Sequence, residues 1–410
     1  MYLCGNINYF NPLSLLARIS FLYIMITYIS ANVIYPITAP PIKNGVIAVN
    51  EDGSIHSVLN QTQAQHIIGV KHYDGVLVPG FINTHCHLEL SHLRNKIEEK
   101  TGLTTFIKSI LSLRQQPDEE VTDAMQKADQ EMFENGIVAV GDISNVLLSK
   151  DVKRGSKIYY HTFIEVFGFN RPSEPIIAEG IKLKNEFLPL KSTIVPHAPY
   201  SVSSELFNEI RLLATENDIQ SIHNQETIGE NELFETGTGK FADFFTELGI
   251  AQSNAHHSGE NSLHYHLPQL AKNINTLLVH NTFSTKADIV FANNQHKQLY
   301  WCLCPNANLY IENTLPDVEL LRNEALKITL GTDSLASNHQ LNILAEMKTL
   351  QDHKHISFEE SLTWATLNGA EFLGIDSQYG SLSVGKKPGI NLIQLGANQE
   401  IEKLKVQRIF

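Results

Sequence analysis

Short apolar runs that each end on a polar residue recur along this chain. One of them, VLVPGFINTH at residues 76–85, has the character of a strand and ends at His85. We expect eight such strands, most of them separated by helical patterns. They end near His85, Asp142, Glu165, His197, His223, His280, Asn306 and Asp333. Polar or ionisable residues therefore fall at equivalent positions of the predicted strands.

The segments between these strands are amphipathic. SSELFNEIRLLATEND, residues 203–218, starts with a serine cap and places Leu206, Ile210, Leu213 and Ala214 on one helical face. Strand and helix alternating in this way predict an α/β fold, a (β/α)8 barrel of the TIM type, over residues 78–375. The C-terminal strand ends of such a barrel form one mouth. We therefore expect polar residues that are distant in sequence to meet there.

Both ends of the chain carry a different, β-rich pattern. Residues 25–77 contain short apolar runs with Pro-Pro and Asp-Gly turn signals. Residues 376–410 resume β character in GSLSVGKKPGINLIQL. We expect the two segments to pair into one small β-domain beside the barrel.

An apolar stretch near the start of the chain requires a separate interpretation. Arg18 interrupts it, and the uninterrupted part, residues 19–29, is shorter than the roughly 20 residues that span a bilayer. Met25 stands just ahead of the β-rich pattern. We interpret residues 1–24 as a non-native extension of the reading frame, with an N-terminal anchor as the alternative.

Two gaps between predicted strand ends are roughly twice as long as the others, the gaps after His85 and after His223. We expect these insertions to form walls or a lid over the mouth. The second insertion contains four histidines in QSNAHHSGENSLHYH, which we expect in a solvated loop without a metal: His256, His257, His264 and His266.

Composition narrows the class of partner. The formal charge is −13 and no long basic run is present. Nucleic-acid polymers bind clustered Lys and Arg, so they are not expected as partners. The 4 cysteines contain no CxxC pair and suggest no disulfide framework. A cytoplasmic protein with no membrane partner fits these features, with Cys302 and Cys304 packed inside the barrel.

The motif HCHLELSH begins with two histidines separated by one residue. In a strand, residues i and i+2 point to the same side, so His85 and His87 project together while Cys86 turns away. Two imidazoles at a strand end suit a divalent metal such as zinc. Because HxH also occurs by chance, the interpretation depends on the other strand ends.

PGFINTHCH, HNQE, a histidine that ends the sixth strand, and GTDS together resemble the motifs of the amidohydrolase superfamily. The likeness is to its mononuclear-metal branch, with adenosylhomocysteine and aminodeoxyfutalosine deaminases and triazine hydrolases. It extends over residues 29–400 in order and spacing. The resemblance implies hydrolysis of a small heterocycle by water, and it makes a homodimer the candidate assembly.

The residue types agree with that implication. A catalytic zinc site has a few protein ligands and one open position. The first, fifth and eighth strands supply them: His85, His87, His223 and Asp333. No lysine ends the fourth strand, where the binuclear branch carries a carboxylated one. We therefore expect one divalent ion, zinc, with iron or manganese as alternatives set by availability.

Catalytic roles follow from the same motifs. Glu226 lies three residues after His223, where it could move a proton from the metal-bound water to a ring nitrogen. His280 would hold the nucleophile or the developing charge, either by hydrogen bonding or as a ligand. Asp333 could also accept a proton as metal-bound hydroxide attacks. Collapse of the tetrahedral intermediate would release ammonia.

Substrate contacts rest on the resemblance alone. His197, in PHAPYS, resembles a histidine that contacts the substrate in adenosylhomocysteine-type deaminases. Glu89 and His92, in HLELSH, fall where the first loop of the family faces the pocket. Arginines that would hold the amino-acid end of adenosylhomocysteine are not recognisable. Glu165 and Asn306 are left open between a site role and a structural role.

The function that these motifs favour is deamination of an aminated heterocycle, a cyclic amidine, at the 6-amino group of an adenosine-type nucleoside. Triazine-type dechlorination, or deamination of guanine or a formimino compound, would use the same site. An inactive scaffold barrel is a remote alternative. Such scaffolds lose metal ligands, whereas the expected ligands are all present here.

Overall fold

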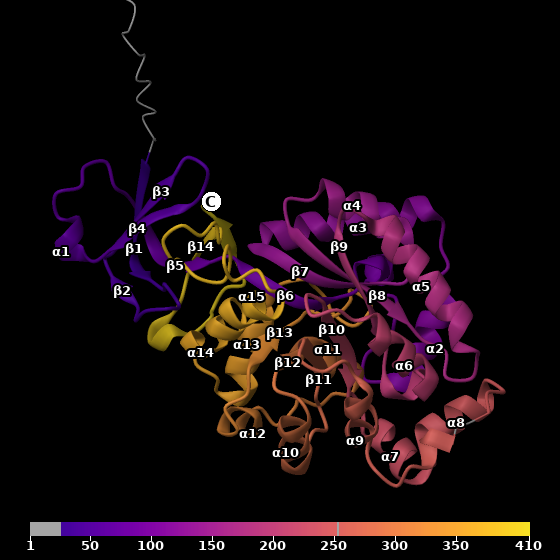
Figure 1. Ribbon diagram of the computed structural model, residues 1–410. Helices are drawn as coiled ribbons and strands as arrows, with labels where there is room; N and C mark the ends of the chain where they lie inside the picture. Colours follow the sequence, from indigo (N-terminus) through magenta and orange to yellow (C-terminus); the bar gives the residue numbers. More distant parts are fainter. Residues whose placement is uncertain (1–25, 252–253) are drawn as a thin grey trace, which may run out of the picture.

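The computed structural model describes residues 26–251 and 254–410 (Figure 1). The interpretation of residues 1–24 falls outside the described residues. Two four-stranded parallel sheets form the centre of the larger body, and they contain the eight strands that the sequence predicts. The first has β6 (Phe81–Cys86), β7 (Ile137–Ser144), β8 (Tyr159–Val166) and β9 (Lys191–Pro196). The second has β10 (Ile219–Asn224), β11 (Asn275–His280), β12 (Leu299–Leu303) and β13 (Ile328–Leu330).

The two sheets contact each other at both edges. Between β9 and β10, the backbone N–H of His223 donates to the carbonyl of His197 at 3.0 Å. Between β13 and β6, the N–H of Asp333 donates to the carbonyl of His85 at 3.1 Å, next to a parallel bridge that pairs Cys86 with Asp333. All eight strands therefore run in the same direction, and their C-terminal ends lie on one side of the molecule.

Helices cover the outer faces of these strands, as the periodicity predicts. Ser203 caps α6 by accepting a hydrogen bond from the N–H of Leu206 at 3.1 Å. Leu206 and Ile210 of the predicted apolar face are buried, but Leu213 is exposed at the last position of the helix and Ala214 is already extended, so the prediction is wrong for these two. The helices are α1 (Gln61–Ala64), α2 (Leu103–Leu113), α3 (Asp118–Glu134), α4 (Lys150–Gly155), α5 (Ser173–Phe187), α6 (Ser204–Leu213), α7 (Ile228–Thr236), α8 (Lys240–Glu247), α9 (Ser262–His266), α10 (Lys286–Gln295), α11 (Pro305–Ile311), α12 (Val318–Asn323), α13 (Ile343–Lys354), α14 (Phe358–Trp364) and α15 (Leu367–Phe372).

A seven-stranded sheet stands beside this body and takes strands from both ends of the described chain (Figure 1). Its strand order is β15-β14-β5-β1-β3-β4, with β2 on β1. In its centre β5 pairs in parallel with β1 and antiparallel with β14. Its strands are β1 (Ile26–Ile34), β2 (Ile42–Lys43), β3 (Val46–Asn50), β4 (Ile55–Leu59), β5 (Lys71–Pro79), β14 (Ile390–Ile393) and β15 (Val406–Arg408).

Gly80 connects β5 of this sheet to β6 of the larger body. A Cβ at this position would lie 2.6 Å from the carbonyl oxygen of Pro388 and 2.2 Å from Val138. The chain can pass between the two sheets here only because this residue has no side chain.

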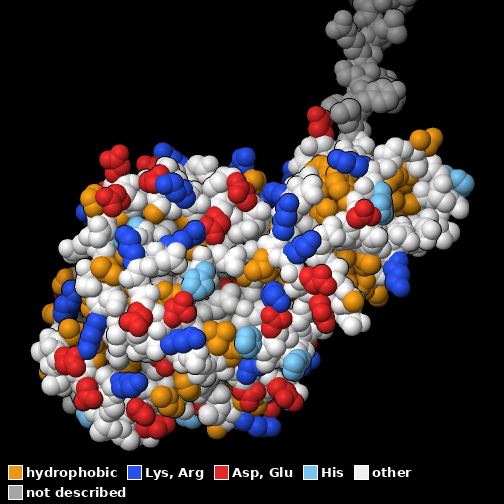
Figure 2. All heavy atoms as spheres, turned by 180° about the vertical axis from the view of Figure 1, so that it is seen from behind, with side chains coloured by type: hydrophobic (Ala, Val, Ile, Leu, Met, Phe, Trp, Pro, Cys, Tyr) orange, Lys and Arg blue, Asp and Glu red, His pale blue; other side chains and the backbone are white. Residues whose placement is uncertain are grey.

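The face drawn in Figure 2 has no single dominant character. Acidic and basic side chains are interspersed over this face. Among the described helices, none combines the length and the apolar character that a membrane crossing requires.

The histidines of the second long insertion differ from the expectation of a solvated loop. His256 is 1% exposed and His266 is fully buried, so the expectation is wrong for these two. The reason is aromatic packing, because the ring of His256 stacks on Phe245 of α8 with centroids 5.3 Å apart. His257 is exposed and His264 is half-buried.

Candidate active site

The C-terminal strand ends bring together the four side chains that the sequence predicts as metal ligands. His85 lies at the C-terminal end of β6, and its Nε2 lies 3.1 Å from Nε2 of His87. The Nε2 atom of His87 is also 3.3 Å from Nε2 of His223, at the end of β10. Asp333 follows β13, with Oδ1 at 3.5 Å from His85 and 3.4 Å from His87.

This donor set fits a divalent ion such as zinc. Imidazole nitrogens and a carboxylate oxygen are its usual ligands. Ring nitrogens this close together would repel through their lone pairs unless a cation or a proton lay between them. The four side chains that the sequence predicted to converge therefore lie together in an arrangement that suits a metal ion.

Neighbouring groups orient two of the four ligands. His223 directs Nδ1 to the carbonyl oxygen of His197 at 2.8 Å, which leaves Nε2 facing the other histidines. The hydroxyl of Ser337 donates to Oδ2 of Asp333 at 2.6 Å, so Oδ1 faces the histidines. Gly331 allows this turn to lie against the strand, since a Cβ there would be 2.8 Å from Cβ of His85.

Burial and charge set the protonation of these groups. Burial lowers the pKa of His87 to about 4, and the charge of His85 adds to the effect. Burial, followed by the charge of His85, holds the pKa of His223 well below its usual value. Burial alone would raise the pKa of Asp333, but the hydrogen bond from His85 and the charges of the surrounding histidines together outweigh burial and hold this pKa well below its usual value. Burial would lower the pKa of His85, but the hydrogen bond and the charge of Asp333 outweigh it and raise that pKa. A carboxylate and neutral imidazoles bind a metal, so Asp333, His87 and His223 are held toward the binding form and His85 would release a proton to the incoming ion.

Glu226 lies beside this cluster on a strained turn. Its Oε1 is 3.6 Å from Nε2 of His280, which ends β11. Gln225 has a φ of 45° and His280 a φ of 75°, both in the left-handed region that residues with a Cβ rarely adopt. The carboxylate of Glu230 holds the turn by accepting a hydrogen bond from the N–H of Gln225 at 2.9 Å.

The pKa values of these two groups move in opposite directions. Burial, followed by the charge of Asp333, raises the pKa of Glu226 well above that of an ordinary carboxyl group. Burial lowers the pKa of His280 to about 3. At neutral pH Glu226 is therefore held toward its protonated form, and His280 is a neutral imidazole.

A cavity of about 270 Å³ opens above the cluster. His87, His223, Glu226, His280 and Asp333 lie on its inner side. The two long insertions form its apolar walls, as the sequence predicts. The walls include Phe106, Ile107 and Ile110 of α2 and, from α8 and the residue that follows it, Phe244, Phe245 and Leu248.

The predicted substrate residues occupy different places. His197 lines the cavity, and its Nδ1 lies 2.7 Å from the hydroxyl of Ser201. The Oε2 atom of Glu89 instead accepts a hydrogen bond from the backbone N–H of Asn145 at 3.0 Å, and His92 directs Nδ1 to the carbonyl oxygen of Glu89 at 3.1 Å. Among the described residues, neither Glu89 nor His92 lines this cavity.

The sequence left Glu165 and Asn306 open between a site role and a structural role, and the structure gives the two residues different places. Glu165 faces the cavity, with Oε1 at 3.7 Å from Nδ1 of His223. Asn306 lies elsewhere, where its side-chain amide donates to buried Glu346 at 2.9 Å.

His280 forms another group of close ligand atoms with His85 and His223, and Glu165, His197 and His223 form a third. Because Nδ1 of His223 is already engaged by a backbone carbonyl, this group does not offer a second metal site.

Several supporting residues gave no clear signal in the sequence. Ser337, Glu230 and Asn308 act on the site through tertiary contacts. Asn145 follows the end of β7 directly, a position that could have suggested a site role. It donates to both the backbone carbonyl and the carboxylate of Glu165.

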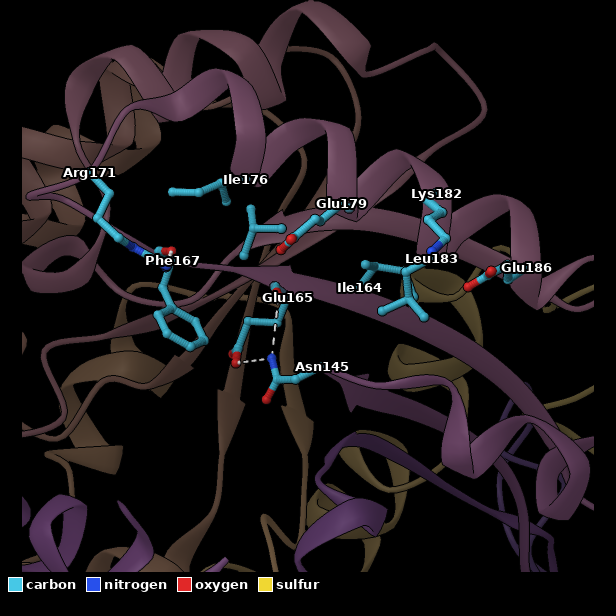
Figure 3. A pocket seen from close by; sticks show the side chains of 12 residues that line it. Asn145, Ile164, Glu165, Phe167, Arg171, Ile176, Glu179, Lys182, Leu183 and Glu186 are labelled. Atoms are coloured by element: carbon cyan, nitrogen blue, oxygen red, sulfur yellow. Dashed lines mark hydrogen bonds between the residues drawn. The ribbon is translucent and has the colours of Figure 1, made fainter. Parts of the chain in front are cut away.

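A second cavity, of about 360 Å³, lies between β8 and α5 (Figure 3). It shares Asn145, Glu165 and Phe167 with the first cavity. Its outer wall includes the exposed residues Arg171 and Glu179. Glu165 and Asn145 therefore form a polar partition between the two cavities.

The hydrogen bond from Ser337 to Asp333 gives a first prediction. Ser337→Ala should weaken zinc binding by about 10- to 100-fold, the range for loss of a group that orients a metal ligand. Competition with a chelator measures this affinity. Ser109→Ala removes a hydroxyl that contacts only its own helix, and it should leave the affinity unchanged. Equal zinc affinity in the wild type and Ser337→Ala would contradict the orienting role.

Comparisons with known proteins agree with this geometry. The model of the amidohydrolase family matches residues 76–409. The adenosine deaminase of Helicobacter pylori is 27% identical over 341 residues, which cover 80% of this chain and 81% of that protein. The aminodeoxyfutalosine deaminase of a Nitratiruptor species is 26% identical over 361 residues, which cover 83% and 85%.

Solved structures show a similar fold. A Helicobacter pylori aminofutalosine deaminase in complex with methylthio-coformycin has a TM-score of 0.78 at 22% identity and covers 91% of this chain and 93% of its own. An adenosine deaminase of Xanthomonas campestris with bound zinc has a TM-score of 0.73 at 22% identity, covering 92% and 87%. An atrazine chlorohydrolase of Arthrobacter aurescens with zinc has a TM-score of 0.72 at 15% identity, covering 90% and 88%.

Proposed function

The chain belongs to the amidohydrolase family, and from this premise we propose that it hydrolytically deaminates an adenosine-type nucleoside at the 6-amino group. The observation that carries the proposal is the placement of Glu226 and His280 beside the histidine and aspartate cluster, at the inner end of a cavity. Relatives named as deaminases of adenosine and aminodeoxyfutalosine support this choice of substrate class.

The proposal includes the architecture that holds the site. The eight parallel strands close into a (β/α)8 barrel over residues 78–375, and residues 25–77 and 376–410 form a separate small β-domain. The hydrogen bonds at both sheet edges, from His223 to His197 and from Asp333 to His85, support closure. The seven-stranded sheet built from both ends of the described chain supports the small domain.

His85, His87, His223 and Asp333 would hold one zinc ion, the metal named for two of the structural neighbours. A metal bound by such ligands makes water nucleophilic near neutral pH. The chain itself contributes three imidazoles, the carboxylate and the hydrogen bonds that orient two of these groups. These groups fix the place of the attacking water relative to the substrate.

Glu226 acts as the proton donor and proton carrier. Its raised pKa keeps a proton available for a ring nitrogen next to the carbon that bears the amine. Protonation draws electrons from that carbon, so water can add and form a tetrahedral centre. Asp333 accepts the proton that water loses. Glu226, now ionised, takes the proton of the hydroxyl on the tetrahedral centre and passes it to the amine. The carbon–nitrogen bond then breaks, ammonia leaves and the 6-oxo product forms, and the proton on Asp333 returns to Glu226.

His280 acts as a hydrogen-bond donor. The side-chain amide nitrogen of Asn308 lies 3.2 Å from Nδ1 of His280, and with this amide donating to Nδ1 the ring would carry its proton on Nε2. That proton faces the cavity on the same side as Glu226. It stabilises the oxygen that develops negative charge as water adds.

Ammonia release from zinc-loaded protein tests the proposed function. We expect release from one or more of adenosine, methylthioadenosine, adenosylhomocysteine and aminodeoxyfutalosine, because the proposed acid and nucleophile positions suit a 6-aminopurine. Guanine, cytosine and an aminotriazine serve as comparison substrates. Ammonia from one of these three alone, or chloride from a chlorotriazine without any deamination, would contradict the proposal.

A further inference from the structure

Glu165 carries a buried carboxylate oxygen that has no hydrogen-bond partner within the described chain. The residue is 7% exposed. Its Oε2 accepts a hydrogen bond from Nδ2 of Asn145 at 3.1 Å, whereas Oε1 receives none. A buried carboxyl oxygen without a hydrogen-bond partner is costly, so its presence calls for a partner that the folded chain does not itself supply.

The position of this oxygen indicates which part of a ligand would reach it. Oε1 lies 3.7 Å from Nδ1 of His223, on the side of that ring opposite to Nε2 and the other ligands. Glu226 and His280 face the cavity near the cluster, where the amine reacts. A substrate reacting there would meet Glu165 with a part remote from the reacting carbon.

We propose that Glu165 accepts hydrogen bonds from the vicinal hydroxyls of a ribose and so selects ribonucleosides. The inference rests on the proposed function. Apart from the reacting amine, an N9-substituted adenine base has no N–H group, so the donors that remain are on the sugar. A carboxylate accepts hydrogen bonds from two adjacent hydroxyls, and charged acceptors form the stronger bonds. The apolar walls on α2 and α8 offer the sugar no such acceptor.

Asn145 orients the carboxylate of Glu165 for binding the sugar. Its side-chain nitrogen donates to the backbone carbonyl of Glu165 at 3.2 Å and to Oε2 at 3.1 Å, and Figure 3 shows both bonds. The free oxygen is thereby held in one orientation. Pre-organisation of this kind lowers the cost of binding, because less side-chain freedom is lost when the ligand arrives.

Glu89, which the resemblance suggested for nucleoside binding, has a different surrounding. Its oxygens already accept hydrogen bonds from the backbone N–H groups of Asn145 at 3.0 Å and Val146 at 3.3 Å. Asn145 therefore links the two carboxylates. Glu89 positions the residue that orients Glu165, and Glu165 contacts the sugar.

The test compares adenosine with its 2′-deoxy and 3′-deoxy analogues on zinc-loaded protein. The wild type should show a kcat/KM about 10- to 100-fold lower for each deoxynucleoside, the effect of losing a hydrogen bond to a charged group. Glu165→Ala should raise KM for adenosine and bring the three kcat/KM values within about twofold of one another. Glu165→Gln keeps the side-chain shape and serves as the second variant where Glu165→Ala folds poorly. It should also reduce the discrimination between adenosine and the deoxynucleosides.

Two matched variants and a binding measurement complete the experiment. Glu179→Gln changes an exposed carboxylate of the neighbouring cavity, so the wild-type discrimination should persist. In calorimetry, the wild type should bind inosine more tightly than 2′-deoxyinosine, and Glu165→Ala should bind the two equally. Circular dichroism and zinc content confirm that each variant is folded and loaded.

The outcomes separate this inference from the proposed function. An equal loss of kcat/KM on all three nucleosides in Glu165→Ala, with discrimination unchanged, would show a merely structural role and overturn the inference. Loss of discrimination in Glu89→Gln, but not in either Glu165 variant, would overturn it in favour of Glu89. A wild type that releases ammonia from no adenosine-type nucleoside would reject the proposed function, and the inference with it.

Discussion

Replacing Glu226 by glutamine is expected to lower kcat by about 1,000-fold while the zinc content stays at the wild-type value. Positioned acid–base groups contribute about 10²–10⁴-fold to rate. The pKa of Glu226 is raised by burial, so the resting carboxyl is held toward its neutral form and glutamine preserves both shape and charge. The loss would therefore report the missing proton rather than a disturbed fold. Steady-state kinetics and metal analysis on the same preparation measure both quantities.

The matched control for this prediction is Glu235→Gln. Glu235 is an exposed residue of α7, and its replacement should leave kcat unchanged. A nearly wild-type kcat in Glu226→Gln would show that Glu226 does not transfer a proton in the reaction. A variant that lost its zinc would instead show that Glu226 supports the metal.

His223→Ala is expected to abolish activity by removing zinc. The Nε2 atom of His223 is one of the converging donors, 3.3 Å from that of His87. Loss of a ligand should weaken binding by more than the roughly 100-fold that follows loss of an orienting partner. Because bound zinc stabilises the folded state by mass action, the rise of Tm on adding zinc should disappear as well.

Metal content after dialysis and thermal unfolding with and without zinc measure this second prediction. His223→Gln provides a variant of similar bulk if alanine destabilises the strand end. His257→Ala changes an exposed histidine of the same chain and should retain zinc. One zinc per chain in both His223 variants would refute the proposed ligand set.

The sequence predicted what depends on local pattern. Strand ends could be recognised from apolar runs, so His85, His87, His223 and Asp333 could be assigned to one mouth before any coordinates. The α/β class with parallel strands is confirmed. The family is confirmed by the match over residues 76–409.

Contacts between distant segments could not be predicted in this way. The sequence placed both Glu165 and Asn306 at predicted strand ends, but β12 ends at Leu303 and Asn306 lies in α11. Only the structure shows that Asn306 is bound to Glu346 while Glu165 faces the cavity. The polar surroundings of His256 in the sequence suggested solvent, yet aromatic side chains from other segments bury its ring. Side-chain burial of this kind depends on tertiary packing, which a local pattern does not record.

The continuity of β5 with β6 has a consequence for how the chain is made. β5 pairs with β14, for example Leu77 with Leu392, although roughly 300 residues separate them along the chain, a long-range contact of the kind that slows folding. During synthesis this edge of β5 must wait until nearly the whole polypeptide has left the ribosome. The strand that carries His85 is thus joined to β5, which gains its partner β14 only late in synthesis, and nascent chains lacking β14 expose an unpaired edge that can recruit other chains.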